Sequence, residues 1–158
     1  RHEAEKSGSD VFSFFPIARR CQVSRFRLLE NVYLLNKWKL ISSKASAQGG
    51  RADSEGKRKV LPKIEVLPPG TICTESYLLL LPTSIEKEAE NAASYVKTMF
   101  FRFLLSLKVI TQNISKDSFS FVPLQDFSHP WTDEMLYEKY GLDEKEISFI
   151  ESMIRPME

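Results

Sequence analysis

The sequence predicts an α+β domain with a mixed or antiparallel sheet, one long buried helix and a C-terminal pair of short helices. Three observations favour this class. Strand-like stretches fill the first half of the chain, apolar residues recur at helical spacing over 83–107, and two helix-capping patterns follow residue 131. At 158 residues, with 42% hydrophobic and 27% charged residues, the chain is long enough for a single domain with its own core.

The first half is expected to supply the strands. Residues 1–36 are predicted to form an N-terminal extension or strands, and residues 37–42 alternate charged and apolar side chains as a half-buried strand does. Residues 42–59 are rich in serine, glycine and charge, which predicts a long flexible loop. Further strands are expected over 60–67 and 71–81. Together with the following helix and residues up to 127, these elements form the predicted core.

The stretch Thr83–Leu107 is predicted to be one continuous helix and the spine of the domain. Thr83 and Glu86 have the spacing of a capping box. In the second half, Phe101 and Leu105 make the polar face apolar as well, so this half is expected to be buried. We expect the C-terminal helices to pack against it.

Residues 128–158 are predicted to form a helical tail. The first tail helix is expected over 133–140, between a threonine N-cap and a glycine stop. The second begins with a capping box made by Asp143 and Glu146, and it ends before Pro156.

The composition excludes several kinds of site. Cys21 and Cys73 are isolated, and His2 and His129 are the only histidines, so no metal site or disulfide framework is predicted and a cytoplasmic location is expected. Apolar runs are far shorter than the roughly 20 residues of a membrane span, so no membrane partner is expected. Because the chain begins with Arg1, we expect it to be part of a larger protein.

Charge is segregated along the chain. Residues 37–63 contain eight basic and two acidic residues, which is an excess of six positive charges. From residue 126 onward the chain contains nine acidic and three basic residues, which is an excess of six negative charges. This pattern predicts a basic surface for an anionic partner and an acidic surface that faces elsewhere. Two solvated segments could give the same counts by chance.

The basic segment contains the residue types of a nucleic-acid interface. Phosphate contacts are predicted for Lys37, Lys39, Lys44, Arg51, Arg58, Lys59 and Lys63. Base contacts or loop positioning are predicted for Gln48, Arg51, Thr74, Glu75 and Ser76. For the last three, pairing of hydroxyl-bearing residues across a sheet is an equal alternative.

One pattern has the spacing of a metal-dependent nuclease. Asp53, Glu55 and Lys57 follow one another at alternate positions, as the acids and lysine of such sites do. We expect them in a loop too loose to hold metal geometry. No catalytic or metal-binding residue is therefore predicted.

Five stretches stand together in a characteristic order: WKLISSKAS (Trp38–Ser46), CTESYLL (Cys73–Leu79), EAENAASYVKTMFFRFLL (Glu88–Leu105), SFVPLQDF (Ser120–Phe127) and WTDEMLYEKYGL (Trp131–Leu142). In this order they resemble the C-terminal target-recognition region of bacterial N6-adenine DNA methyltransferases, especially of fused restriction–modification enzymes. The resemblance covers roughly Trp38 to Met157. Residues 1–36 have no counterpart in it.

The resemblance implies a DNA target-recognition domain that positions a separate catalytic domain and is no enzyme alone. Such enzymes methylate in a domain marked by an Asn/Asp-Pro-Pro-Tyr/Phe tetrapeptide, which this sequence lacks, since its Pro-Pro pair lies between Leu67 and Gly70. The expected partners are double-stranded DNA and the methyltransferase domain of the same polypeptide. No cofactor is expected in this chain; S-adenosylmethionine, with Mg²⁺ as a further candidate, would serve the parent adenine-N6 methyltransferase.

Two questions stay open at this point. The resemblance leaves undecided whether the parent also cleaves DNA. The alternative function is an interaction or scaffold module, whose acidic tail docks the catalytic domain or a subunit while the chain itself has little affinity for DNA.

Overall fold

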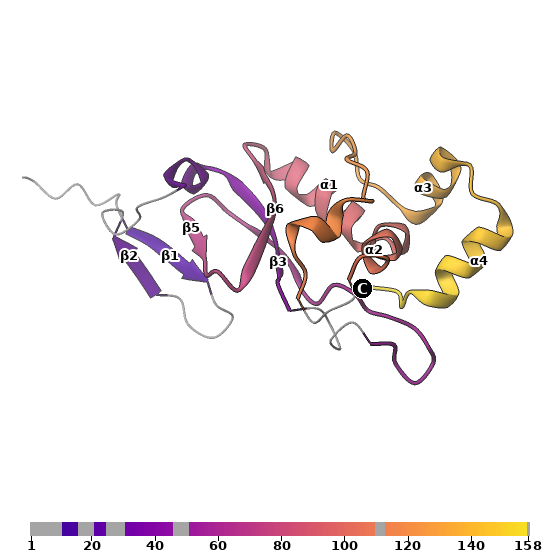
Figure 1. The fold of residues 1–158 in the computed structure, drawn as a ribbon. Helices are drawn as coiled ribbons and strands as arrows, with labels where there is room; N and C mark the ends of the chain where they lie inside the picture. The colour runs from indigo at the N-terminus through magenta and orange to yellow at the C-terminus, as the bar shows by residue number, and fades with distance from the viewer. Residues whose placement is uncertain (1–10, 16–20, 25–30, 46–50, 110–112, 158) are drawn as a thin grey trace, which may run out of the picture.

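The computed structural model describes residues 11–15, 21–24, 31–45, 51–109 and 113–157 (Figure 1). Over these ranges the predicted α+β class is confirmed. In chain order the elements are β1 (Val11–Phe15), β2 (Cys21–Ser24), the 3₁₀ helix η2 (Val32–Asn36), β3 (Trp38–Ser43), β4 (Ile64–Leu67), β5 (Thr71–Cys73), β6 (Tyr77–Thr83), α1 (Glu86–Lys97), α2 (Met99–Ser106), the 3₁₀ helix η4 (Lys116–Phe119), α3 (Asp133–Tyr140) and α4 (Glu144–Met153).

The central sheet is antiparallel and has the strand order β4-β3-β6. In the middle strand, Leu40 pairs with Val66 of β4 and with Leu81 of β6. A bulge follows, because Ile41 pairs with Leu79 and leaves one extra residue in β6. Four consecutive residues of β3 are buried, so the strand is covered on both faces.

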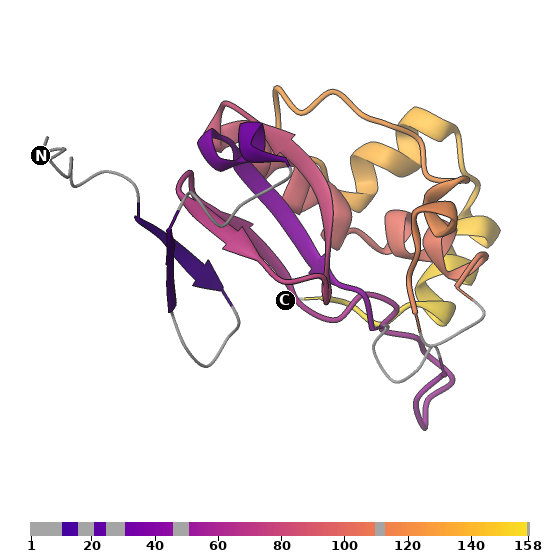
Figure 2. The same cartoon turned by 60° about the vertical axis from the view of Figure 1, so that its left-hand side comes forward.

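A second, smaller sheet has the order β2-β1-β5, with β1 antiparallel to β2 and parallel to β5. Figure 2 shows it beside the central sheet, on the side away from the helices. The single strand predicted over 71–81 is wrong in detail. A turn separates β5 from β6, and the Tyr77 N–H donates to the Thr74 carbonyl at its close (3.1 Å).

The continuous helix predicted over Thr83–Leu107 is also wrong in detail, because two helices meet at Thr98. The backbone of Thr98 is extended (ψ 151°), and its hydroxyl donates to the Tyr95 carbonyl and accepts from the Phe101 N–H. The threonine therefore caps α2 and interrupts the helical backbone pattern. The capping box predicted at Thr83 does not form, since its hydroxyl bonds to the Glu88 carboxylate and the N-cap is Ile85.

The C-terminal helix pair is confirmed with its signals. The Thr132 hydroxyl caps α3 by accepting from the Met135 N–H, and Gly141 ends that helix at φ 65°. Asp143 and Glu146 form the predicted capping box of α4.

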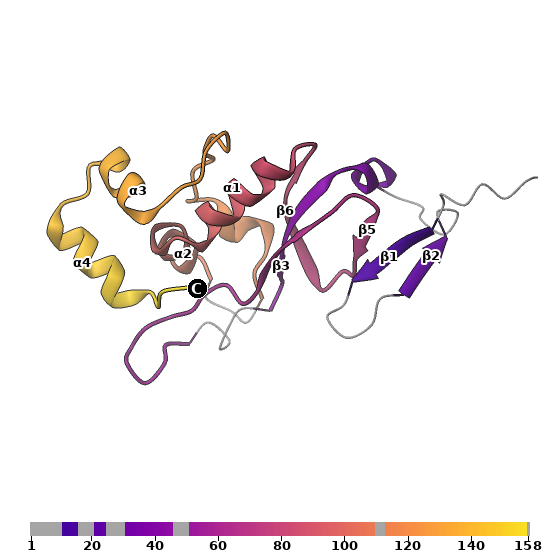
Figure 3. The same cartoon turned by 180° about the vertical axis from the view of Figure 1, so that it is seen from behind.

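The predicted packing of the tail against the second half of the long helical stretch is confirmed as well. Figure 3 shows α3 and α4 beside α2, on the side away from the sheets. Phe100 of α2 stacks on Tyr140 of α3 with 5.0 Å between ring centroids. Phe103 meets Phe149 of α4 edge to face at 5.9 Å. The helix α1 packs on the central sheet, so α1 and α2 link the sheet to the tail.

Candidate nucleic-acid interface

The structure distributes the predicted phosphate contacts over several surfaces. Lys37 precedes β3, and its Nζ donates to the hydroxyl of Ser84, which lies between β6 and α1. Lys44 follows β3 at the opposite end, where its N–H donates to the Ser76 carbonyl and its carbonyl accepts from Ile114. At about 3.3 Å per strand residue, the two lysines are roughly 20 Å apart. They therefore lie at opposite ends of the central sheet, and neither lines the groove described below.

The prediction that Lys39 contacts phosphate is wrong. Its side chain is 4% exposed, and its Nζ donates to the carbonyls of Leu34 (3.0 Å) and Lys37 (2.6 Å). Burial lowers the pKa of Lys39, while the neighbouring Cys73 thiol acts in the opposite direction. Charge alternation suggested an outward lysine, but the middle strand of the sheet has no open face.

Four cations gather at a surface groove of about 880 Å³. They are Lys59, Lys63, Lys97 and Arg155, and they line it together with Pro62, Ile64, Pro156 and Met157. We call these eight residues the basic groove. They come from the segment before β4, the start of β4, the end of α1 and the C-terminal segment. Two of the seven predicted phosphate contacts, Lys59 and Lys63, are therefore joined by two cations that the sequence did not single out.

Backbone hydrogen bonds fix the walls of the basic groove. The Arg58 N–H donates to the Met153 carbonyl (2.8 Å), and the Arg155 N–H donates to the Arg58 carbonyl (3.0 Å). This short parallel bridge ties the C-terminal segment to the basic segment before β4. Arg58 itself lines a neighbouring apolar hollow with Phe103 and Phe149. Its role here is to hold the wall through its backbone.

The cations of the basic groove differ in their ion pairs. The Lys63 Nζ lies 2.8 Å from the Glu65 Oε1, and the Arg155 Nη1 lies 3.7 Å from the Asp53 Oδ2. In the described part of the chain, Lys59 and Lys97 have no acidic partner, and both are exposed. In both pairs the cation is 61% exposed, whereas the carboxylates of Glu65 and Asp53 are 13% and 12% exposed. An incoming anion therefore meets the exposed side of each of these cations.

Within the predicted flexible loop of residues 42–59, residues 53–57 form a closed turn. The Asp53 N–H donates to the Lys57 carbonyl (2.8 Å), and the Asp53 carboxylate accepts from the N–H groups of Glu55 and Lys57 (both 2.9 Å). Asp53 therefore holds the turn and contacts Arg155. Within the described ranges, no three acidic, histidine or cysteine side chains come together as metal ligands.

Of the predicted base-contacting residues, those that the structure describes do not line the basic groove. Thr74, Glu75 and Ser76 form the turn between β5 and β6, which rules out the alternative of strand hydroxyls paired across a sheet. Hydrogen bonding between Ser76 and Lys44 brings this turn to the end of β3. Arg51 is exposed, and Gln48 lies outside the described residues. Their base contacts stay a prediction.

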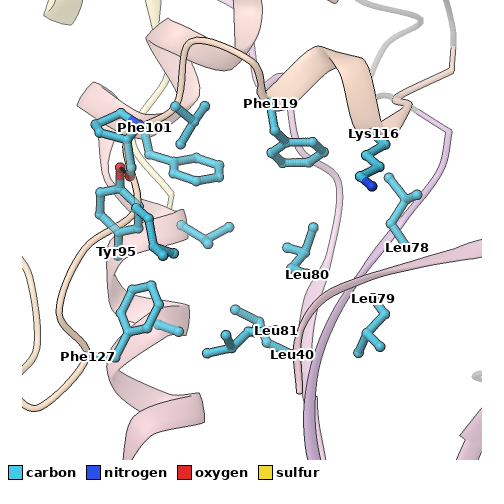
Figure 4. Close-up of a pocket in the computed structure, with 15 residues that line it drawn as sticks. Leu40, Leu78, Leu79, Leu80, Leu81, Tyr95, Phe101, Lys116, Phe119 and Phe127 are labelled. Atoms are coloured by element: carbon cyan, nitrogen blue, oxygen red, sulfur yellow. Dashed lines mark hydrogen bonds between the residues drawn. The ribbon is translucent and has the colours of Figure 1, made fainter. Parts of the chain in front are cut away.

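An apolar pocket of about 490 Å³ lies between β6, α1 and residues 116–127 (Figure 4). Its walls include Phe101, Phe119 and Phe127 beside leucines of β6. The hydroxyl of Tyr95, on the α1 wall, donates to the Pro123 carbonyl (2.7 Å). Recognition of an extruded base needs hydrogen-bond partners for its edge. This pocket offers mainly hydrocarbon and aromatic surface, so it does not suit a base.

The buried Tyr95 predicts a loss of stability at alkaline pH. Burial raises the pKa of Tyr95 to about 12 in the folded chain. The unfolded chain releases this proton near pH 10, so its contribution to stability is complete below about pH 10 and declines as pH rises toward 12. Urea unfolding between pH 8 and 11 should show a steeper decline for the wild type than for Tyr95→Phe. The same substitution at the exposed Tyr33 is the control, and equal slopes for all three proteins would contradict the assignment.

Comparisons of this chain with known protein families, curated proteins and solved structures found no similar protein. The resemblance to methyltransferase target-recognition regions therefore stays a prediction carried by the five sequence stretches. Among the described helices, none has the length and apolar character needed to cross a membrane.

Proposed function

We propose that this chain is the sequence-specific DNA-recognition module of a restriction–modification adenine methyltransferase, and that it positions a separate catalytic domain on its site. The observation that carries DNA binding is the basic groove, in which four cations from distant segments line one surface. Ammonium and guanidinium groups are the usual partners of backbone phosphates. The methyltransferase context rests on the resemblance over residues 38–157.

In this proposal, phosphate binding and base reading use different surfaces. Lys59 and Lys97 meet phosphates directly, while Lys63 and Arg155 meet them from their exposed side and keep their contacts to Glu65 and Asp53. Base contacts fall to the segment around Arg51 and to the turn after β5. Phosphate contacts fix the register of a protein on the duplex, and base contacts then select the sequence.

The chemistry belongs to the parent protein under this proposal. The parent's methyltransferase domain binds S-adenosylmethionine, with Mg²⁺ as a candidate second cofactor, and it acts on double-stranded DNA in the cytoplasm. The chain described here supplies recognition and no reacting group.

The proposal is tested by fluorescence anisotropy with labelled duplex DNA at several salt concentrations. Neutralising four phosphates should give a slope of about −3.6 for the logarithm of the association constant against the logarithm of salt concentration. Absence of binding to a mixture of duplex sequences at low salt would contradict DNA recognition by this chain.

A docking or scaffold function is the second candidate, and the acidic surface of α3 and α4 favours it. Three glutamates of these helices line one groove. A module of this kind would bind a protein partner through the tail and keep that affinity when the cations of the basic groove are replaced.

A further inference from the structure

The apolar hollow next to the basic groove has a volume of about 410 Å³ and lies among α2, α4 and the segment before β4. Its walls include Arg58, Phe103, Ser106, Leu107, Phe149 and Met153. The rings of Phe103 and Phe149 meet edge to face, at 84° between their planes. Phe149 is nevertheless 55% exposed, so much of its ring is left uncovered. An exposed aromatic ring in a hollow is a surface on which a flat ligand can stack.

Two polar side chains also line the apolar hollow. Arg58 is half-buried, and its guanidinium has no ion-pair or hydrogen-bond partner in the described part of the chain. Ser106 is buried, and its hydroxyl donates to the Phe103 carbonyl (2.7 Å), which leaves the Ser106 oxygen able to accept. Partial burial of an unpaired charge costs free energy, and a ligand with acceptor atoms offsets that cost. The hollow therefore offers both donors and an acceptor beside an open aromatic ring.

The apolar hollow adjoins the basic groove along two chain segments. Arg58 lines the hollow, and the next residue, Lys59, lines the groove. On the facing segment, Met153 lines the hollow and Arg155 lines the groove. Backbone hydrogen bonds from Arg58 to Met153 and Arg155 hold these two segments together. One or two residues correspond to about 3–7 Å of extended backbone, so a nucleotide with its phosphate in the groove can place its base in the hollow.

We propose that the apolar hollow binds one unpaired nucleobase of the DNA whose phosphates lie in the basic groove, with the base stacked on the Phe149 ring and its edge facing Arg58 and Ser106. This binding mode rests on the DNA recognition proposed above. A cationic groove with an aromatic stacking surface is the usual combination in sites for unpaired nucleotides. Arg58 can donate to the ring nitrogens and carbonyls of a base, and Ser106 can accept from an amino group. An aliphatic side chain from a partner protein would fill the hollow but leave the Arg58 guanidinium without an acceptor.

The test compares three labelled DNAs by fluorescence anisotropy at one low salt concentration. They are a blunt duplex, the same duplex with one unpaired adenine bulged from its centre, and the same duplex with a short single-stranded end. The wild type should bind a DNA with unpaired nucleotides about tenfold more tightly than the blunt duplex, as expected for one stacked base. Tighter binding of the bulged DNA supports a base extruded from a duplex, and tighter binding of the single-stranded end alone supports a base from a single strand. Equal affinity for all three DNAs would overturn this binding mode and leave duplex recognition intact, whereas absence of binding to all three would overturn both.

Substitutions at Phe149 assign the tighter binding to the apolar hollow. Phe149→Leu keeps an apolar side chain without an aromatic face, so the preference for unpaired nucleotides should fall to within about twofold, while Phe149→Trp should keep it. Phe121→Leu changes an aromatic residue of similar exposure (52%) outside the hollow, and it should keep the wild-type preference. Unfolding would weaken binding of all three DNAs, so unchanged affinity for the blunt duplex shows that the loss is specific. A preference that persists in Phe149→Leu, or that Phe121→Leu loses equally, would overturn the proposal.

Discussion

Replacing Arg102 with alanine is expected to lower the free energy of unfolding by about 4 kcal/mol, because a fully buried side chain and three hydrogen bonds are lost together. Arg102 is 0% exposed. Its Nε donates to the carbonyls of Lys97 and Thr98 (both 3.1 Å), and its Nη1 donates to the carbonyl of Arg155. These carbonyls belong to the end of α1, to the break before α2 and to the C-terminal segment.

Arg102 also organises the basic groove, since two of its acceptors are the backbone carbonyls of Lys97 and Arg155. Burial lowers the pKa of Arg102 to about 10, while Asp133 and Tyr137 oppose this change, so the guanidinium is charged at neutral pH. The substitution Arg102→Met keeps much of the apolar volume and removes the donors. Urea unfolding followed by circular dichroism should place Arg102→Met between the wild type and Arg102→Ala. A loss below about 1 kcal/mol for alanine would contradict the role of Arg102 as the link between these segments.

Asp133→Ala is expected to lower the free energy of unfolding by about 2 kcal/mol. The Asp133 carboxylate accepts from the N–H groups of Met99 (2.9 Å) and Phe100 (2.8 Å), which are free at the first turn of α2. A negative charge at a helix N-terminus is also favoured by the helix dipole. Asp133 thus fastens α3 to the start of α2 across the sequence.

The substitution Asp133→Asn is the matched comparison for this prediction. An amide keeps one acceptor oxygen and loses the charge, so the loss of stability should be about half that of alanine. Because Asp133 also raises the pKa of Arg102, the double variant Arg102→Ala/Asp133→Ala should be less destabilised than the sum of the single changes. Strictly additive losses in the urea titration, or equal effects of asparagine and alanine, would count against this account.

Local signals in the sequence were reliable where the structure itself is local. The capping pattern of Asp143 and Glu146 and the threonine and glycine around α3 predicted both tail helices, because each motif is satisfied within its own turn. The break at Thr98 could not be predicted in this way. The apolar spacing of α1 continues into α2, and the break is stabilised by Asp133 and Arg155, which lie far along the chain.

The basic groove also depends on contacts between distant segments, which local sequence patterns do not predict. The basic composition predicted an anionic partner, but it treated seven cations as one surface, whereas β3 separates Lys37 from Lys44 and buries Lys39. Lys97 and Arg155 carried no sequence signal, since a lone cation at a helix end and another near the C-terminus are ordinary. Only the bridge between Arg58 and the C-terminal segment, with the docking of α1 on the sheet, brings them to the basic groove.

The most direct test of the account is the salt dependence of DNA binding by groove variants. Lys59→Ala/Lys97→Ala removes two exposed cations of the basic groove, and Lys116→Ala/Lys145→Ala removes two exposed cations outside it. We expect the groove variant to have a slope about 1.8 units shallower than the wild type, because two phosphate contacts are lost, and we expect the control to keep the wild-type slope. Equal slopes for the two double variants would contradict phosphate binding in the basic groove.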